Sequence, residues 1–331
     1  MNYTDYVPYM PRPDFDRHPA YGGMFKPVLS DRYKALRKFI YFFFIQIKKA
    51  RSFKPKSYLK RPPFAKIGVT DDVILNSFLT NGAVPLQLTS KQIEYIRSSI
   101  SEYIRKVEDH KAKIKPSDRM FRDKVAHIDK SEVPAFYQEM STILRDMGII
   151  KAASEYRNTE LKVSNMEIMV NHPDDPDWKN HFADIGLEDP QTSYMHLDSS
   201  FRPVKCLIYL SEVTEDTGPF MYVLGSNRIN ISWLEFLIRK ANDKSGLDKC
   251  DPQNSKLFYA LPSFLRKKSE FGNDLLNDST ETPALLENEK HFTSQDGNIF
   301  LIDTDGIHRG GMLKSGKRIM LHVLFGPTSV R

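Results

Sequence analysis

The chain has 331 residues, of which 40% are hydrophobic and 27% are charged, and its formal net charge is +6. This composition is that of a globular protein with a sizeable core, and it excludes low-complexity and collagen-like chains. Two cysteines, Cys206 and Cys250, are too few for a disulfide framework and indicate a reducing compartment. The N-terminus does not have the pattern of a secretory signal, and no apolar run approaches the ~20 residues that span a bilayer. We therefore expect a cytoplasmic protein.

Basic residues concentrate near the N-terminus, where residues 31–66 hold twelve Lys and Arg but a single acidic residue. Within this stretch, residues 33–51 place apolar side chains at helical spacing, with Lys and Arg at both ends. Two interpretations stay open: residues 33–61 lie on an anionic membrane at its inner face, or the apolar side of the helix packs on the core. No nucleic-acid-binding motif accompanies the charge, so we expect no nucleic acid as partner. We treat residues 1–65 as a basic N-terminal arm.

Helical patterns follow up to about residue 148. Residues 76–86 predict a short helix, a glycine stop and a strand. Thr89-Ser-Lys-Gln92 is a capping box that opens a helix. The apolar face of that helix consists of Ile93, Ile96, Ile100, Ile104 and Val107. A second helix begins near Pro134 and has Gly148 as its C-cap.

After residue 160 the pattern alternates, which predicts strands. They are expected around residues 166–170, 204–210, 220–224, 298–302 and 318–325, with a turn at 314–317 before the last one. Residues 231–290 interrupt the pattern with an amphipathic helix around Trp233, and we interpret them as a lid-like insertion. Helices followed by many short strands indicate an α+β domain over residues 66–331 with a sandwich or barrel core.

Three candidate metal ligands and one arginine stand out. His196 and Asp198 are two residues apart, so in a strand both side chains lie on one face and can reach one metal ion. His308 lies far from them in the sequence, so the fold must bring it next to them. Two imidazoles and a carboxylate form a ferrous site with open coordination positions. Arg318 lies across the 314–317 turn from His308, and we expect a hairpin to bring its guanidinium to the site, where it can bind a carboxylate. These residues predict an iron oxygenase that consumes 2-oxoglutarate and O2.

Other residues are candidates for supporting roles because of their positions near the proposed ligands. Lys205 and Tyr209 alternate to a common face after the His-x-Asp motif, and we interpret them as co-substrate-binding residues. The alternative is an ordinary surface lysine and a packed tyrosine. Arg309 contacts either substrate or a neighbouring carboxylate. Three further histidines near the motifs are expected to be structural: His172, His181 and His322.

Three longer stretches resemble the phytanoyl-CoA dioxygenase family of iron(II)- and 2-oxoglutarate-dependent oxygenases. Asp216-Thr-Gly-Pro-Phe-Met-Tyr-Val-Leu-Gly-Ser-Asn-Arg228 is similar to its Gly-Pro…Gly-Ser-His signature, with Asn227 where histidine is usual. Asp296 to Gly310 is similar to the strand that carries the second histidine, and Phe78 to Val84 is similar to the family's N-terminal opening. The resemblance covers residues 70–331.

This resemblance implies a double-stranded β-helix, the jelly-roll core of cupin-like proteins, with flanking N-terminal helices. It implies His196, Asp198 and His308 as ligands of Fe(II), Arg318 as the anchor of 2-oxoglutarate, and hydroxylation of an unactivated carbon. Related halogenases have a small residue where Asp198 stands, so an intact carboxylate favours hydroxylation. We expect a small-molecule substrate, with a lipid-linked compound or a lipopolysaccharide sugar as candidates. The alternative is a non-catalytic cupin-like module that binds a metal or ligand.

Overall fold

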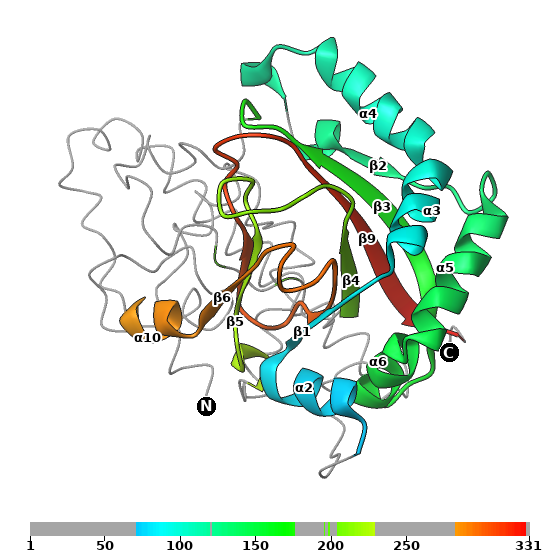
Figure 1. The fold of residues 1–331 in the computed structure, drawn as a ribbon, viewed down its shortest axis with the longest axis vertical. Coiled ribbons are helices and arrows are strands. Elements are labelled where there is room, and N and C mark those ends of the chain that lie inside the picture. The colour runs from blue at the N-terminus through cyan, green and yellow to red at the C-terminus, as the bar shows by residue number, and fades with distance from the viewer. Residues whose placement is uncertain are drawn as a thin grey trace, which may run out of the picture. The chain divides into compact units, whose positions relative to one another are not determined.

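The computed structural model describes residues 71–119, 121–175, 195, 198, 204–228 and 282–328 (Figure 1). The expected arm over residues 1–65, most of the expected insertion and His196 lie outside this part. The chain divides into two units. The first comprises Met1–Pro62, Trp178–Arg202 and Ile229–Asn288, and its described part includes helix α10 (Thr282–Glu287). The second comprises Pro63–Asp177, Pro203–Arg228 and Glu289–Arg331 and carries all of the described strands.

The described part of the second unit has five α-helices, all of which lie before strand β3 (Leu161–Asn171) in the sequence. They are α2 (Val73–Asn81), α3 (Ser90–Ser99), α4 (Ser101–Ala112), α5 (Pro134–Asp146) and α6 (Ile149–Arg157). The capping box is confirmed, because the Thr89 hydroxyl accepts from the Gln92 amide and the Gln92 side chain accepts from the Thr89 amide. None of the helices within the described ranges is long and apolar enough to cross a membrane.

The predicted helix after the capping box is interrupted at Ile100, whose φ of −116° is not helical. On either side of it, the Ser98 and Ser101 hydroxyls bond backbone carbonyls, and such local bonds compete with helix continuation. Gly148 has the expected left-handed conformation, with φ of 75°. It ends one helix and immediately begins α6, which the sequence pattern did not reveal.

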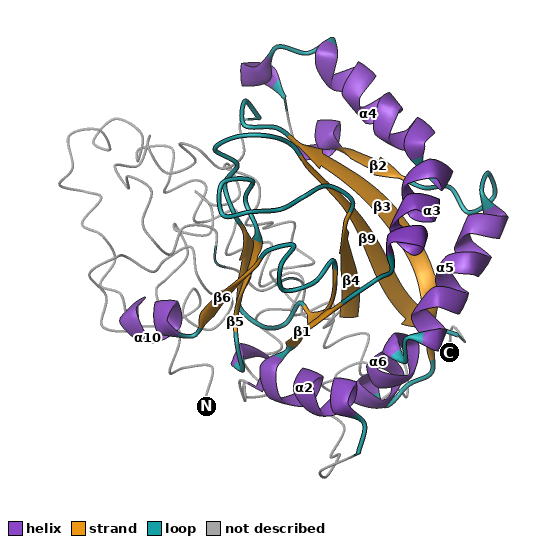
Figure 2. Cartoon of the chain, viewed as in Figure 1, coloured by secondary structure: helices purple, strands orange, loops and turns teal. Residues whose placement is uncertain are grey.

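All of the described strand pairs are antiparallel, in two sheets (Figure 2). The larger sheet has the order β1-β7-β4-β9-β3-β2, with bounds β1 (Ala83–Leu86), β7 (Ile299–Asp303), β4 (Val204–Tyr209), β9 (Arg318–Pro327), β3 (Leu161–Asn171) and β2 (Val125–His127). The smaller sheet has the order β6-β5-β8, with β6 (Glu289–Phe292), β5 (Phe220–Val223) and β8 (His308–Gly310). The α+β class with antiparallel sheets is therefore confirmed for the described residues.

The larger sheet has two buried faces. One packs against the helices through alternate residues of its strands, among them Met166, Ile168, Val170, Val204, Cys206, Ile208, Leu321 and Val323. The other packs against the smaller sheet, through Met169, Leu207, Tyr209, Phe300 and Met320 facing Phe220, Tyr222 and Phe292. Because side chains alternate along a strand, each strand of the larger sheet serves both layers. We call the second surface the inner face.

Candidate active site

His308 is the first residue of β8 and lies against the inner aromatic layer. It is 7% exposed, and the register pairs it with Tyr222 of β5. Its ring stacks on that of Tyr222, with centroids 6.2 Å apart and planes at 17°, and lies 5.9 Å from the ring of Phe220. Aromatic neighbours thus fix the orientation of the imidazole.

One backbone contact determines the tautomer of His308. Its Nδ1 lies 2.8 Å from the carbonyl oxygen of Gly306. A carbonyl can only accept a hydrogen bond, so Nδ1 carries the proton and, in the neutral ring, Nε2 carries the lone pair. Metal-binding histidines commonly donate their second nitrogen to such an acceptor. This residue therefore fits the role of a metal ligand.

A buried polar network holds the loop that leads into β8. The Asp303 carboxylate is fully buried and accepts a 2.5 Å hydrogen bond from the Tyr156 hydroxyl. Tyr222 donates to the Asp303 carbonyl at 2.8 Å, and the Ile307 amide donates to the Ser226 hydroxyl at 2.7 Å. Burial, aided by the Asp303 carboxylate, raises the pKa of Tyr222 well above its usual value, so this phenol stays a donor. The loop before His308 is thereby fixed from several sides.

Asn227, which stands where the resembling family has histidine, belongs to the same network. It is 1% exposed, and its Nδ2 donates to the Phe78 carbonyl at 3.2 Å and to the Tyr156 hydroxyl at 3.1 Å. These bonds connect α2 and α6 to the turn after β5. A structural role accounts for this residue.

Arg318 opens β9 as a buried cation among neutral oxygens. It is 5% exposed. Its Nη1 donates to the carbonyls of Gly218 and Gly311, and its Nη2 lies 3.4 Å from Asn171 Oδ1. Its buried Nε makes no hydrogen bond with any described residue, and no carboxylate of the described ranges forms an ion pair with it. Burial lowers the pKa of the guanidinium, which nevertheless stays charged. A buried charge of this kind favours an anionic ligand.

The expected hairpin between His308 and Arg318 is wrong. β8 belongs to the smaller sheet and β9 to the larger one, so the segment between them passes from one sheet to the other. The guanidinium still reaches the end of β8, because Nη1 bonds the Gly311 carbonyl and Nη2 lies 3.7 Å from where a Cβ on Gly310 would stand. Contact across the two sheets, rather than pairing along a hairpin, brings Arg318 to the strand of His308.

Lys205 and Tyr209 do share a face of β4, the inner face, together with Leu207. The Tyr209 hydroxyl donates to the Phe292 carbonyl and accepts from the Phe220 amide, both at 2.8 Å. Burial raises the pKa of Tyr209 to about 12, although the nearby Arg318 charge opposes the shift. Its one hydroxyl proton is therefore used within the protein, as in a packed tyrosine. Half-buried Lys205 stays a predicted co-substrate residue.

The other two predicted metal ligands lie elsewhere in the chain. His196 is outside the described residues, and Asp198 is a half-buried residue of the first unit. Among the residues that the structure describes, no group of three His, Cys, Asp or Glu side chains could hold a metal ion. The three-ligand set therefore stays a prediction.

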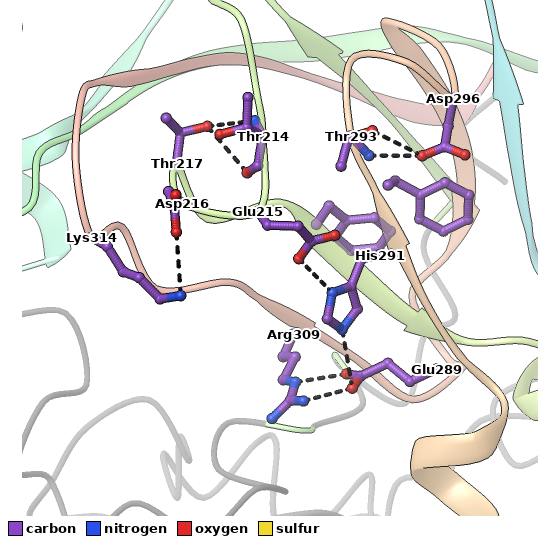
Figure 3. Close-up of polar contacts among 12 residues, drawn as sticks. Thr214, Glu215, Asp216, Thr217, Glu289, His291, Thr293, Asp296, Arg309 and Lys314 are labelled. Atoms are coloured by element: carbon purple, nitrogen blue, oxygen red, sulfur yellow. Dashed lines mark hydrogen bonds and ion pairs between the residues drawn. The ribbon is translucent and has the colours of Figure 1, made fainter.

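Arg309, the residue after His308, binds a neighbouring carboxylate (Figure 3). Its Nε and Nη2 donate to the two oxygens of Glu289 at 2.7 and 2.6 Å. His291 lies beside this pair, with Nε2 3.6 Å from Glu289 and Nδ1 2.8 Å from Glu215. Of the two interpretations of Arg309, contact with a carboxylate is confirmed. No local sequence signal pointed to Glu289.

Comparison with known proteins finds only distant likenesses. No protein-family model and no curated protein sequence matches the chain. Among solved structures, HygX from Streptomyces hygroscopicus, with nickel and 2-oxoglutarate bound, is 15% identical, with 79% of this chain and 88% of that chain covered and a TM-score of 0.42. EctD from S. alaskensis, with 2-oxoglutarate and 5-hydroxyectoine, is 13% identical over 81% and 82%, with a TM-score of 0.45. EvdO2 from Micromonospora carbonacea var. aurantiaca is 14% identical over 80% and 94%, with a TM-score of 0.44.

Proposed function

We propose that the chain is a mononuclear iron(II)- and 2-oxoglutarate-dependent dioxygenase that hydroxylates an unactivated carbon of a small molecule. The observation that carries this proposal is the buried Arg318, which is surrounded by neutral oxygens at the end of the strand that His308 begins. 2-Oxoglutarate has the two matching groups. Its keto acid end can bind a metal, and its distal carboxylate can form a charge-assisted pair with a guanidinium.

Each residue then has a defined task. His308, with its lone pair on Nε2, would bind the ion together with His196 and Asp198. Arg318 would hold the distal carboxylate and so orient the co-substrate. A bound ferrous ion supplies the activation of O2 that is coupled to decarboxylation of 2-oxoglutarate to succinate. The aromatic layer of Tyr222 and Phe220 would keep water from the imidazole.

The sheet arrangement supports a double-stranded β-helix as the core. β9 pairs with β3 and β4 in one sheet, whereas β8 pairs with β5 in the other, and the two sheets face each other through an apolar layer. Jelly rolls stack two antiparallel sheets in this manner, with consecutive strands that change sheets.

The competing proposal is a non-catalytic cupin-like module that binds a metal or ligand. A buried guanidinium without a carboxylate partner in the described part favours the enzyme, because a module of that kind does not require a co-substrate anchor. Succinate formation from 2-oxoglutarate with ferrous iron and O2 separates the two. Asp198→Ala should abolish it, and retained turnover would remove Asp198 from the ligand set.

Arg318 provides the sharper test. Arg318→Met keeps an unbranched apolar stem but removes the charged guanidinium. A charge-assisted contact contributes roughly 1.5–3 kcal/mol, so the KM for 2-oxoglutarate should rise about 10- to 150-fold. Arg309→Met is the matched control, because this guanidinium binds Glu289 and its loss should leave that KM unchanged. An unchanged KM in Arg318→Met, or a wild-type protein that forms no succinate, would reject the proposal.

Contact with a membrane through residues 33–61, and with it a lipid-linked substrate, is a separate proposal that rests on charge placement. Flotation of the full chain with phosphatidylserine vesicles and with phosphatidylcholine vesicles tests it. Equal recovery with both would leave the second interpretation, in which the apolar side of the segment packs on the core.

A further inference from the structure

A buried ion pair lies at the end of β3, the strand whose last residue, Asn171, pairs with Arg318. Lys111 of α4 is 1% exposed, and its Nζ lies 2.6 Å from Oδ2 of Asp175, which is 5% exposed. The same Nζ donates to the carbonyl of Val170 at 3.0 Å. Arg119 adds a second cation, with Nη1 3.2 Å from the other carboxylate oxygen of Asp175. The pair thus joins α4 to the last residues of the strand.

These contacts hold the backbone on both sides of Asn171, the last residue of β3. The Val170 carbonyl, just before it, accepts from Lys111, and the His172 amide, just after it, donates to Asp175 Oδ2 at 2.9 Å. Both flanking peptide groups are therefore fixed by the same ion pair.

Asn171 in turn contacts the predicted anion site. It is 1% exposed, the strand register pairs it with Arg318, and its Oδ1 lies 3.4 Å from Nη2. The other two acceptors of this guanidinium are backbone carbonyls. Of the acceptors in the described part, Asn171 is thus the one whose position depends on how β3 ends.

The charges of the pair agree with this arrangement. Burial alone would raise the pKa of Asp175, but the hydrogen bonds from Lys111 and the His172 amide outweigh it and lower that pKa. Burial lowers the pKa of Lys111, and its bond to Asp175 opposes the shift. An ionised Asp175 therefore has cationic partners on both carboxylate oxygens. The desolvation penalty of a buried ion pair can exceed its Coulombic gain, so stability alone does not explain this pair, whereas fixing the local geometry does.

We propose that Lys111 and Asp175 are positioning residues of the anion site, which hold Asn171 and through it orient the Arg318 guanidinium toward the distal carboxylate of the co-substrate. This inference rests on the proposed function. It assigns Lys111 no contact with substrate and no part in the chemical step. Its effect should appear in the selectivity for a dicarboxylate, because only that ligand has a group that reaches Arg318.

The test compares two keto acids on the anaerobic, Fe(II)-loaded full chain. Pyruvate has the keto acid end of 2-oxoglutarate but has no distal carboxylate. Calorimetric titration gives the Kd of each keto acid on the Fe(II)-loaded protein and the Kd of Fe(II) on the metal-free protein, for wild type and for Lys111→Met. Tyr103→Phe is the matched control, because it removes another side-chain hydrogen bond of the same helix. This bond, 2.6 Å from the Tyr103 hydroxyl to Glu132, involves no residue of β3.

Lys111→Met should raise the Kd of 2-oxoglutarate about tenfold, which is about 1.4 kcal/mol, and leave the Kd values of pyruvate and Fe(II) unchanged. Tyr103→Phe should change none of the three. If Lys111→Met does not fold, Asp175→Asn keeps an acceptor for the His172 amide and should show the same selective loss in smaller size.

If the wild type prefers 2-oxoglutarate, two outcomes in Lys111→Met would overturn the positioning role alone. They are an unchanged Kd of 2-oxoglutarate and an equal loss of affinity for both keto acids. A wild type that binds 2-oxoglutarate no more tightly than pyruvate would overturn the proposed function as well. Preference for the dicarboxylate in the wild type and its selective loss in the variant would support both.

Discussion

The contribution of the hydrogen bond between Tyr156 and Asp303 to stability can be tested by removing the Tyr156 hydroxyl. The Tyr156 hydroxyl donates to Asp303 Oδ2 at 2.5 Å, and the two residues are 2% and 0% exposed. Tyr156→Phe removes this hydroxyl and keeps the ring, which packs on Phe78 with centroids 4.3 Å apart. The variant therefore changes hydrogen bonding while leaving the packed volume nearly intact.

The size of the effect follows from burial. A buried acceptor that loses its hydrogen-bond donor costs roughly 1–3 kcal/mol. The bond from Asn227 to the same hydroxyl is lost too, although Asn227 keeps its bond to the Phe78 carbonyl. We expect the free energy of unfolding to fall by about 2–3 kcal/mol.

Urea unfolding followed by circular dichroism measures the change. Tyr95→Phe is the matched control, because Tyr95 is 37% exposed and its replacement should cost less than about 0.5 kcal/mol. A double-mutant cycle with Asp303→Asn then isolates the coupling between the two side chains. If Tyr156→Phe costs no more than Tyr95→Phe, the bond between Tyr156 and Asp303 does not hold the loop before His308.

Two further predictions concern the glycines on either side of His308 and the ion pair of Asp175. Gly306→Ala places a Cβ on the Tyr222 hydroxyl and should lower the free energy of unfolding by roughly 1–3 kcal/mol. Gly310→Ala should be tolerated, because the nearest atom to its added Cβ is 3.7 Å away. Equal urea midpoints for the two variants would contradict this prediction. The lowered pKa of Asp175 means that its contribution is present above its unfolded pKa of about 3.9 and lost as pH falls through the folded value. The stability difference between wild type and Asp175→Asn should therefore shrink between pH 6 and pH 3 (roughly the carboxyl range), and a constant difference would refute the assignment.

Local sequence signals explain which helices and strands could be predicted from the sequence. The capping box at Thr89, the helix start at Pro134 and the alternation through Met166 and Val170 each depend on residues a few positions apart. Such signals act before any tertiary contact forms, so they survive in the folded chain. They correctly indicated an α+β chain.

Long-range contacts explain what the sequence could not predict. β8 has only three residues, too few for a periodic signal, and its sheet is decided by pairing of His308 with Tyr222. The hairpin error has this origin, because a turn after β8 does not reveal that the next strand joins the other sheet. The partners of the site were hidden for the same reason: Glu289 is 20 residues from Arg309, and Asn171 is 147 residues from Arg318.

A comparison of the acceptors of Lys111, Arg309 and Arg318 supports the proposal of an anion site at Arg318. Lys111 has Asp175 at 2.6 Å, and the largely buried Arg309 has both oxygens of Glu289 within 2.7 Å. Arg318 is as deeply buried, yet its acceptors in the described residues are two carbonyls and one carboxamide. A buried charge whose described acceptors are all neutral is costly, so these acceptors support the proposal that an anionic ligand completes the surroundings of Arg318. Under the proposed function, the distal carboxylate of 2-oxoglutarate would be that anion.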